Sequence, residues 1–199
     1  MGYPLKKEDR IYTYKDYLNW PDGERWELIE GVAYNMTPSP SRSHQKISLA
    51  IATEIYQYLK GKKCEVYQAP FDVRFPESNE KDENIKTVVQ PDIVIICDPS
   101  KLDEKGCQGS PDLIIEIISP STAPHDYITK LNLYEKNRVP EYWIIHPRDR
   151  IAMVYRRTAD GKYGKAEIYS QEDAVKMGIF EDFSLNMELI FSGLPEEPF

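Results

Sequence analysis

The chain has 199 residues, a length that suits one domain with its own hydrophobic core. Its hydrophobic share of 41% and its charged share of 29% are ordinary for a globular protein. The formal net charge of −8 excludes a protein coated in basic charge for tight non-specific nucleic-acid binding, although it leaves room for a local basic face. We therefore predict a single domain over residues 1–199.

The cysteines and the apolar content predict a cytoplasmic protein. Cys64, Cys97 and Cys107 are odd in number and lack CxxC spacing, which indicates reduced thiols rather than a disulfide framework or a zinc site. Residues 1–14 show no apolar core of a signal peptide. No apolar run approaches the roughly 18 residues that a membrane span needs, so we expect no membrane partner.

Periodicity and turn residues predict the first elements. A short helix over residues 13–20 has Thr13 as its N-cap, and the hairpin that follows turns near Gly31. Gly61 ends the strongest helix, within residues 39–61, whose apolar stripe comprises Ile47, Ile51, Ile55, Tyr58 and Leu59.

The rest of the chain is richer in strands. One or two strands surround Pro70, further strands are expected at residues 88–97, 112–119 and 141–147, and residues 98–111 are expected to form a loop. A helix is expected over residues 124–137. A hairpin joins residues 151–157 to 163–170, and the tail adds a last short strand or helix. This order predicts an α/β (α+β) fold in which helices flank a mixed central β-sheet.

Glu116 is the most informative residue, because it stands inside the apolar strand 112–119. Burying a lone carboxylate costs several kcal/mol, so such a group needs a proton, a cation or an opening of the fold. Asp92 begins the neighbouring apolar strand, and strand alternation lets the two side chains stand side by side if the strands pair with matching faces.

Two adjacent carboxylates cannot both ionise cheaply, and a divalent cation removes the conflict. Magnesium suits ligation by one or two carboxylates plus water. On a wheel of 100° per residue, Lys130 lies about 60° from Tyr127, inside the apolar stripe of the next helix, so its side chain could reach the same place. Two carboxylates, a metal and a lysine are suited to attack on a phosphodiester.

Each of these residues also has a structural interpretation. Glu116 could pair with an arginine or a backbone amide, Asp92 could merely begin a strand after a proline, and Lys130 could run along its helix to solvent. His44, at the start of the long helix, could line the cleft, although a polar residue of a helix N-terminus is the simpler interpretation. The three histidines show no HxxxH spacing, which argues against a zinc site.

A family resemblance rests on these same segments. The runs "QPDIVII", "SPDLIIEIISPST" and "DYITKLNLYEKNRVPEYWIIHP", with "ELIEGVAYNM" and "SPSRSHQKIS" upstream, resemble the Uma-two family of bacterial endonucleases, which is assigned to the PD-(D/E)xK superfamily. The resemblance covers roughly residues 12–190 and implies a restriction-endonuclease-like core.

The resemblance also implies roles for single residues. Asp92 matches the metal-binding aspartate and Glu116 the acidic residue of the (D/E)xK element, while the lysine expected two positions later is Ile118 here. Families with a migrated lysine take it from the following helix, where Lys130 fits. Glu30 matches an additional acidic residue supplied from upstream. The backbone carbonyl of Ile117 is expected as a third metal ligand.

The predicted function is therefore a Mg²⁺- or Mn²⁺-dependent endonuclease acting on nucleic acid, with DNA as the favoured substrate and a homodimer as an option. Residues 146–165 carry six basic against two acidic side chains, a set that could meet a phosphate backbone or protect a sheet edge. Two alternatives stay open: a catalytically inactive binding or oligomeric interaction module, and a carboxylate-pair glycosidase, which would need a sugar cleft that the sequence does not mark.

Overall fold

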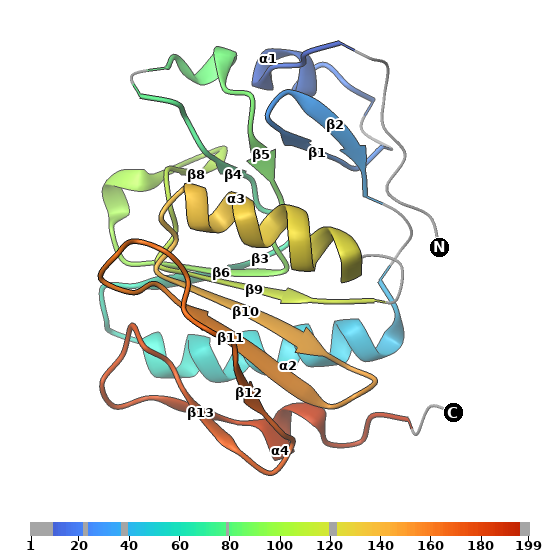
Figure 1. Ribbon diagram of the computed structural model, residues 1–199, viewed down its shortest axis with the longest axis vertical. Helices are drawn as coiled ribbons and strands as arrows, with labels where there is room; N and C mark the ends of the chain where they lie inside the picture. Colours follow the sequence, from blue (N-terminus) through green and yellow to red (C-terminus); the bar gives the residue numbers. More distant parts are fainter. Residues whose placement is uncertain (1–9, 22–23, 37–39, 79, 120–122, 196–199) are drawn as a thin grey trace.

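The computed structural model describes residues 10–21, 24–36, 40–78, 80–119 and 123–195. Two six-stranded sheets and a small hairpin carry the fold, with helices on both faces of the second sheet (Figure 1). The predicted mixed sheet flanked by helices is therefore confirmed. The expectations for residues 1–9 fall outside the described part of the chain.

The first sheet contains the N-terminal hairpin. Its strand order is β2 (Val32–Asn35), β1 (Trp26–Ile29), β5 (Val88–Val89), β4 (Val73–Arg74), β8 (Gly106–Gln108) and β7 (Leu102–Asp103). The last two strands lie within the predicted loop 98–111, where they are too short to leave a periodic pattern.

The second sheet is the centre of the molecule. Its strand order is β12 (Glu167–Tyr169), β11 (Ile151–Arg156), β10 (Glu141–His146), β9 (Leu113–Ile117), β6 (Ile93–Ile96) and β3 (Glu65–Gln68). Strands β9 and β10 are parallel, and the other pairs are antiparallel. The third sheet is the hairpin of β13 (Ala174–Lys176) and β14 (Ser184–Asn186).

Helices cover the second sheet from both sides (Figure 1). Helix α2 (Arg42–Leu59) packs on one face through Ile47, Ile51 and Ile55, and α4 (Met187–Phe191) joins it there. The other face carries η3 (His125–Lys130), a π-helical stretch that continues into α3 (Leu131–Lys136). The short elements are α1 (Tyr14–Tyr17), η1 (Asp82–Asn84) and η2 (Pro99–Lys101).

Turn chemistry explains the N-terminal hairpin. Its two-residue turn holds Glu30 at φ 52° and Gly31 at φ 80°, the left-handed pair that matches the twist of the flanking strands. A Cβ on Gly31 would lie 2.6 Å from Cγ2 of Ile11, so glycine also allows the close approach of the chain there. Thr13 is the N-cap of α1 as predicted, and its backbone N–H donates to the Asp16 carboxylate at 2.9 Å.

The predicted strand 88–97 is two strands, β5 and β6, which belong to different sheets. Pro91 lies between them and has no N–H to donate to a ladder. The chain therefore crosses from the first sheet to the second immediately before Asp92.

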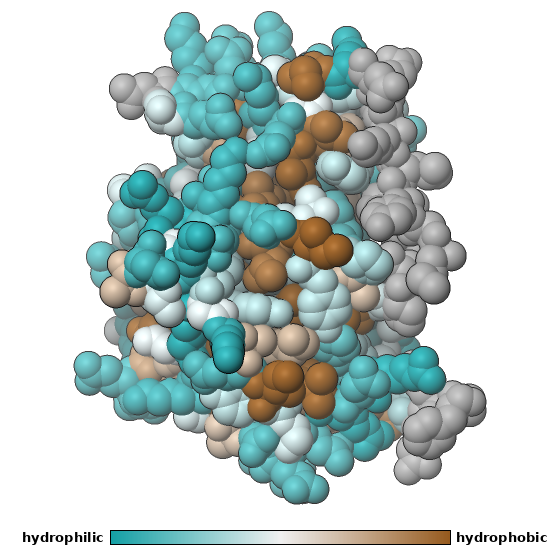
Figure 2. All heavy atoms as spheres, in the orientation of Figure 1, coloured by the Kyte–Doolittle hydropathy of each residue, from teal (hydrophilic) through white to brown (hydrophobic). Residues whose placement is uncertain are grey.

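The core lies on both faces of the second sheet. Alternation along β6 and β9 sends Ile93, Ile95, Leu113 and Ile115 toward α2, and Val94 and Ile114 toward α3. Seen from one side, hydrophilic residues cover most of the surface and apolar residues show in a central band and a patch below it (Figure 2). None of the helices in the described ranges is both long and apolar enough to cross a membrane.

The prediction of three reduced thiols is wrong for two of them. Cys64 and Cys97 form a disulfide, while Cys107 is a buried free thiol. Glu65 is the register partner of Ile96 in the β3–β6 pair, so Cys64 and Cys97 are the next opposed positions and their sulfurs come within bonding reach. Cysteine count and spacing carry no information on such strand pairing.

This pairing predicts the number of reactive thiols. Protein unfolded without reductant should show one thiol, that of Cys107, and three after reduction. Thiol titration in denaturant measures both values, and Cys107→Ser should leave none before reduction. Three thiols in freshly purified, unreduced protein would contradict the disulfide.

Candidate active site

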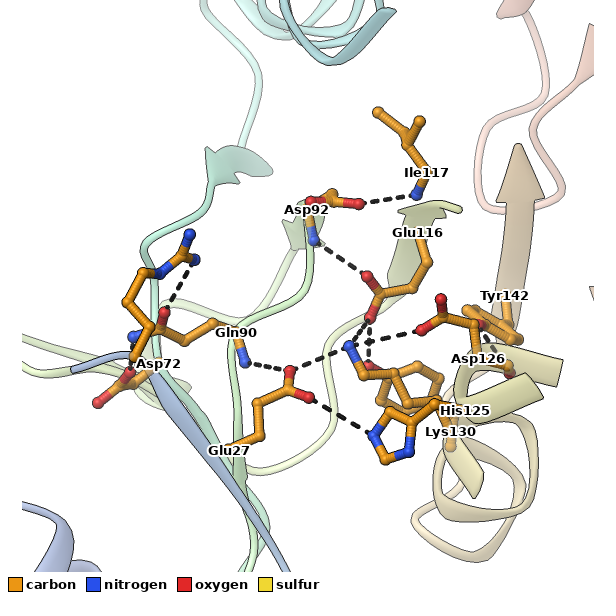
Figure 3. Close-up of polar contacts among 12 residues, drawn as sticks. Glu27, Asp72, Gln90, Asp92, Glu116, Ile117, His125, Asp126, Lys130 and Tyr142 are labelled. Atoms are coloured by element: carbon orange, nitrogen blue, oxygen red, sulfur yellow. Dashed lines mark hydrogen bonds and ion pairs between the residues drawn. The ribbon is translucent and has the colours of Figure 1, made fainter. Parts of the chain in front are cut away.

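Asp92 and Glu116 lie opposite each other, as the alternation predicted. The antiparallel register pairs Ile93 with Ile115 and Val94 with Ile114, so the next opposed pair is Asp92 and Glu116. The backbone N–H of Asp92 is 3.4 Å from Oε2 of Glu116. Oδ2 of Asp92 accepts the backbone N–H of Ile117 at 2.7 Å. The three predicted metal-site residues therefore adjoin one another (Figure 3).

Lys130 reaches the same place from the helical layer. Its Nζ lies 2.9 Å from Oε1 of Glu116, and the Lys130 and Glu116 side chains are each only 5% exposed. Tyr134, one turn further along the helix, donates its hydroxyl to the same Oε1 at 2.7 Å. The predicted meeting of the strand carboxylate and the helical lysine is present in the structure.

Glu27 supplies the upstream acidic side chain, not Glu30. Oε1 of Glu27 lies 3.0 Å from Nζ of Lys130, and Glu27 is buried within β1. Glu30, the residue predicted from the sequence, is exposed in the hairpin turn and pairs with Lys136 at 2.5 Å. The structure therefore does not bring Glu30 to the cluster. Glu116 was singled out because it is a carboxylate inside a buried strand. Glu27 has the same signal in the sequence.

The π-helical stretch η3 adds two more side chains. Oδ1 of Asp126 is 3.7 Å from Nζ of Lys130, and Nε2 of His125 is 3.7 Å from Oε2 of Glu27. Both residues are buried. Asp126 stands four residues before Lys130, the spacing of an ordinary helical ion pair, so this spacing could have indicated Asp126 from the sequence. Figure 3 shows the Lys130 amino group between Glu27, Glu116 and Asp126.

The electrostatics follow from one cation among several carboxylates. Burial by itself would lower the pKa of Lys130, but Glu116, Glu27 and Asp126 outweigh it and raise this pKa well above the usual value. Lys130 is therefore charged at neutral pH. Burial likewise works to raise the pKa of Glu27, but Lys130 and His125 outweigh it and hold this pKa low.

Glu116 has the opposite shift. Burial raises its pKa, the neighbouring charges of Asp92, Asp126 and Glu27 add to the rise, and Lys130 opposes it. The cluster thus has more carboxylates than its lysine can balance. A further cation beside Asp92 and Glu116 would favour the ionised form of Glu116.

The donor set fits a hard divalent cation. Asp92 and Glu116 offer carboxylate oxygens at adjacent positions, and the oxygen-only chemistry is that of Mg²⁺ or Mn²⁺. Within the described ranges, no three His, Cys, Asp or Glu side chains form a ready-made metal cage. A cation at Asp92 and Glu116 would thus need water or substrate to complete its coordination.

A surface hollow lies apart from this cluster. It has a volume of about 420 Å³, and its lining includes Tyr67, Phe71 and Asp72 but neither Glu116 nor Lys130. A line of polar contacts connects the two places, since the Gln90 side chain donates to Asp72 at 2.9 Å and its backbone N–H donates to Glu27 at 3.0 Å. Buried charged side chains converge in the cluster, which is therefore the candidate active site.

Comparisons with known proteins identify the fold and the family. The fold resembles the crystal structure of "a putative nuclease belonging to DUF820" from Anabaena variabilis ATCC 29413, with a TM-score of 0.71 and 20% identity over 90% of this chain and 97% of that one. Residues 14–188 match the Uma2 family, which is described as "Putative restriction endonuclease". The chain belongs to the Uma2 family.

A curated relative from Synechocystis sp. (strain ATCC 27184 / PCC 6803 / Kazusa) is similar in sequence. It is named "Uncharacterized protein slr1290" and is 27% identical over 154 residues, which cover 75% of this chain and 76% of that protein. The match to the Uma2 family model, together with the Anabaena fold, confirms the family resemblance inferred from the sequence.

The buried cluster predicts a large cost for removing its cation. Lys130→Met keeps the hydrocarbon stem but leaves three buried carboxylates around a neutral side chain, so the free energy of unfolding should fall by about 3–5 kcal/mol. Urea denaturation at neutral pH measures the change. The matched control is Lys136→Met, which breaks an exposed pair with Glu30 and should cost about 0–1 kcal/mol. Equal losses in the two variants would contradict this account.

Proposed function

We propose that this Uma2 protein is a metal-dependent endonuclease that hydrolyses phosphodiester bonds of nucleic acid, with DNA as the favoured substrate. The observation that carries the proposal is the pairing of Asp92 with Glu116 beside the buried, charged Lys130. The family's description and the likeness to the Anabaena fold support it. A homodimer, which would let one assembly cut both strands, belongs to the same proposal.

In this proposal Asp92 and Glu116 hold Mg²⁺ or Mn²⁺, with the backbone carbonyl of Ile117 as a third oxygen ligand. Such a cation, when bound, lowers the pKa of a water and neutralises charge that develops on the phosphate. Glu116 presents Oε2 to the site, because Oε1 already accepts from Lys130 and Tyr134. Glu116 thus uses Oε1 for Lys130 and Tyr134 and offers Oε2 to the cation.

Lys130 orients the attacking water or stabilises the phosphate in its transition state. It is charged and buried, and its Nζ lies 2.9 Å from a proposed metal ligand, so its positive charge lies beside the proposed reacting centre. Glu27 and Asp126 hold the ammonium from two other directions. Ile118, at the usual lysine position, is buried in the apolar core, which leaves Lys130 as the lysine of the site.

The basic segment 146–165 contributes less to substrate binding than its composition suggests. Arg156 pairs with Glu141 and Glu167, and Arg157 donates to the carbonyl of Gly161. Both side chains serve the local fold. Arg148, Lys162 and Lys165 are exposed, and they are the residues of this segment that could meet a phosphate backbone.

Cleavage of labelled single- and double-stranded DNA tests the proposal. Wild type should cut in Mg²⁺ or Mn²⁺ and stop when the metal is chelated. Glu116→Gln and Lys130→Met should each lower the rate by at least about 100-fold, because each removes a group that acts on the transition state. Glu27→Gln should also lower it, since Glu27 holds Lys130 in place.

Glu30→Gln is the matched control for Glu27→Gln. It also neutralises a glutamate, but one that lies three residues after Glu27 in the exposed turn. Its rate should stay within about twofold of wild type, as expected for an exposed ion pair. Wild type that cuts no nucleic acid with either metal would contradict the endonuclease proposal and favour a binding module. Cleavage that survives in Glu116→Gln would place the chemistry elsewhere.

A further inference from the structure

His44 contacts the carboxylate that the proposed function assigns to the metal. It lies in the first turn of α2, where its backbone N–H donates to the N-cap hydroxyl of Ser41 at 3.2 Å. Its Nε2 lies 3.0 Å from Oδ2 of Asp92, and its side chain is 15% exposed. The first turn of α2 thus directs the imidazole toward Asp92, the residue before β6.

Oδ2 of Asp92 is fully occupied by this contact. A carboxylate oxygen has two lone-pair sites, and Oδ2 accepts both from the Ile117 backbone N–H at 2.7 Å and from His44 at 3.0 Å. Two donors on one oxygen also fix the rotation of the carboxylate. Oδ1 is consequently the oxygen with capacity for a cation.

Among the described residues, the His44 imidazole makes one hydrogen bond, to Asp92. Nδ1 of His44 is buried and has no hydrogen-bond partner in that part of the chain. The contact with Asp92 therefore requires a proton on Nε2, because the carboxylate oxygen can only accept. A histidine kept for structure alone would be expected to satisfy both ring nitrogens.

A second contact ties α2 to the same strands. The side chain of Gln68, in β3, donates to the hydroxyl of Ser48 at 2.8 Å, one helical turn after His44. The backbone N–H of Ala69 donates to the carbonyl of Asp92 at 3.1 Å. The helix that carries His44 and the backbone that carries Asp92 are thereby joined, which limits relative movement of the two side chains.

We infer that His44 is a positioning residue of the proposed metal site, which saturates Oδ2 of Asp92 so that Oδ1 is presented to the cation. This inference rests on the proposed function. Outer contacts of this kind orient metal ligands, and their loss typically lowers metal affinity by about 10- to 100-fold.

Binding of Mn²⁺ to the full chain, followed by electron paramagnetic resonance and calorimetry, tests the inference without any cleavage assay. His44→Ala should weaken Mn²⁺ binding at least about 10-fold. His44→Gln should recover most of the affinity, because its amide N–H can donate at a similar reach. Gln45→Ala, at the exposed neighbouring position of α2, should bind as wild type does. Thermal melting of each variant shows that α2 and the sheet are intact.

The outcomes separate the two proposals. Equal Mn²⁺ binding by wild type and His44→Ala would overturn the positioning role and leave the metal site standing. His44→Gln as weak as His44→Ala would also overturn it, because the effect would then need the imidazole itself, as a direct ligand would. Wild type that binds no Mn²⁺ would overturn the metal site and the role of His44 together.

Discussion

The site depends on one buried ammonium group among carboxylates that come from different layers. Lys130 in η3 contacts Glu27 of the first sheet and Glu116 of the second, while Asp126 of its own helix adds a third charge. A buried charge without partners is strongly unfavourable, so these elements have to assemble together. The contacts that support the proposed chemistry also hold the helical layer against both sheets.

The same cluster limits how stable the folded protein can be. Burial raises the pKa of Glu116, and the negative charges that Lys130 does not balance add to the rise. Replacement of such a cluster by packed apolar residues is often neutral or stabilising. Under the proposed function, the excess carboxylates at Asp92 and Glu116 are the groups that bind the cation, and they cost stability in its absence.

The sequence located the Asp92–Glu116 pair because strand alternation has a strict period of two, so two buried strands with matching faces admit few arrangements. It misplaced the upstream acid, since Glu27 and Glu30 stand in one short segment and only the turn at Glu30 and Gly31 separates their directions. It missed the contacts of Asp126 and His125, although Asp126 stands at the i, i+4 spacing of a helical ion pair with Lys130. His125 meets Glu27 only through the packing of η3 against the first sheet.

The sequence by itself determined the helices and most strands, the mixed sheet, the family, and the approach of Asp92 and Lys130 to Glu116. The elements follow from local periodicity, and the family follows from sequence motifs spread along the chain. Tertiary structure alone decided the choice of Glu27 over Glu30, the reach of His44 to Asp92 and the disulfide between Cys64 and Cys97. Each of these joins segments far apart in sequence, and strand register and helix packing, which no local pattern encodes, set their distances.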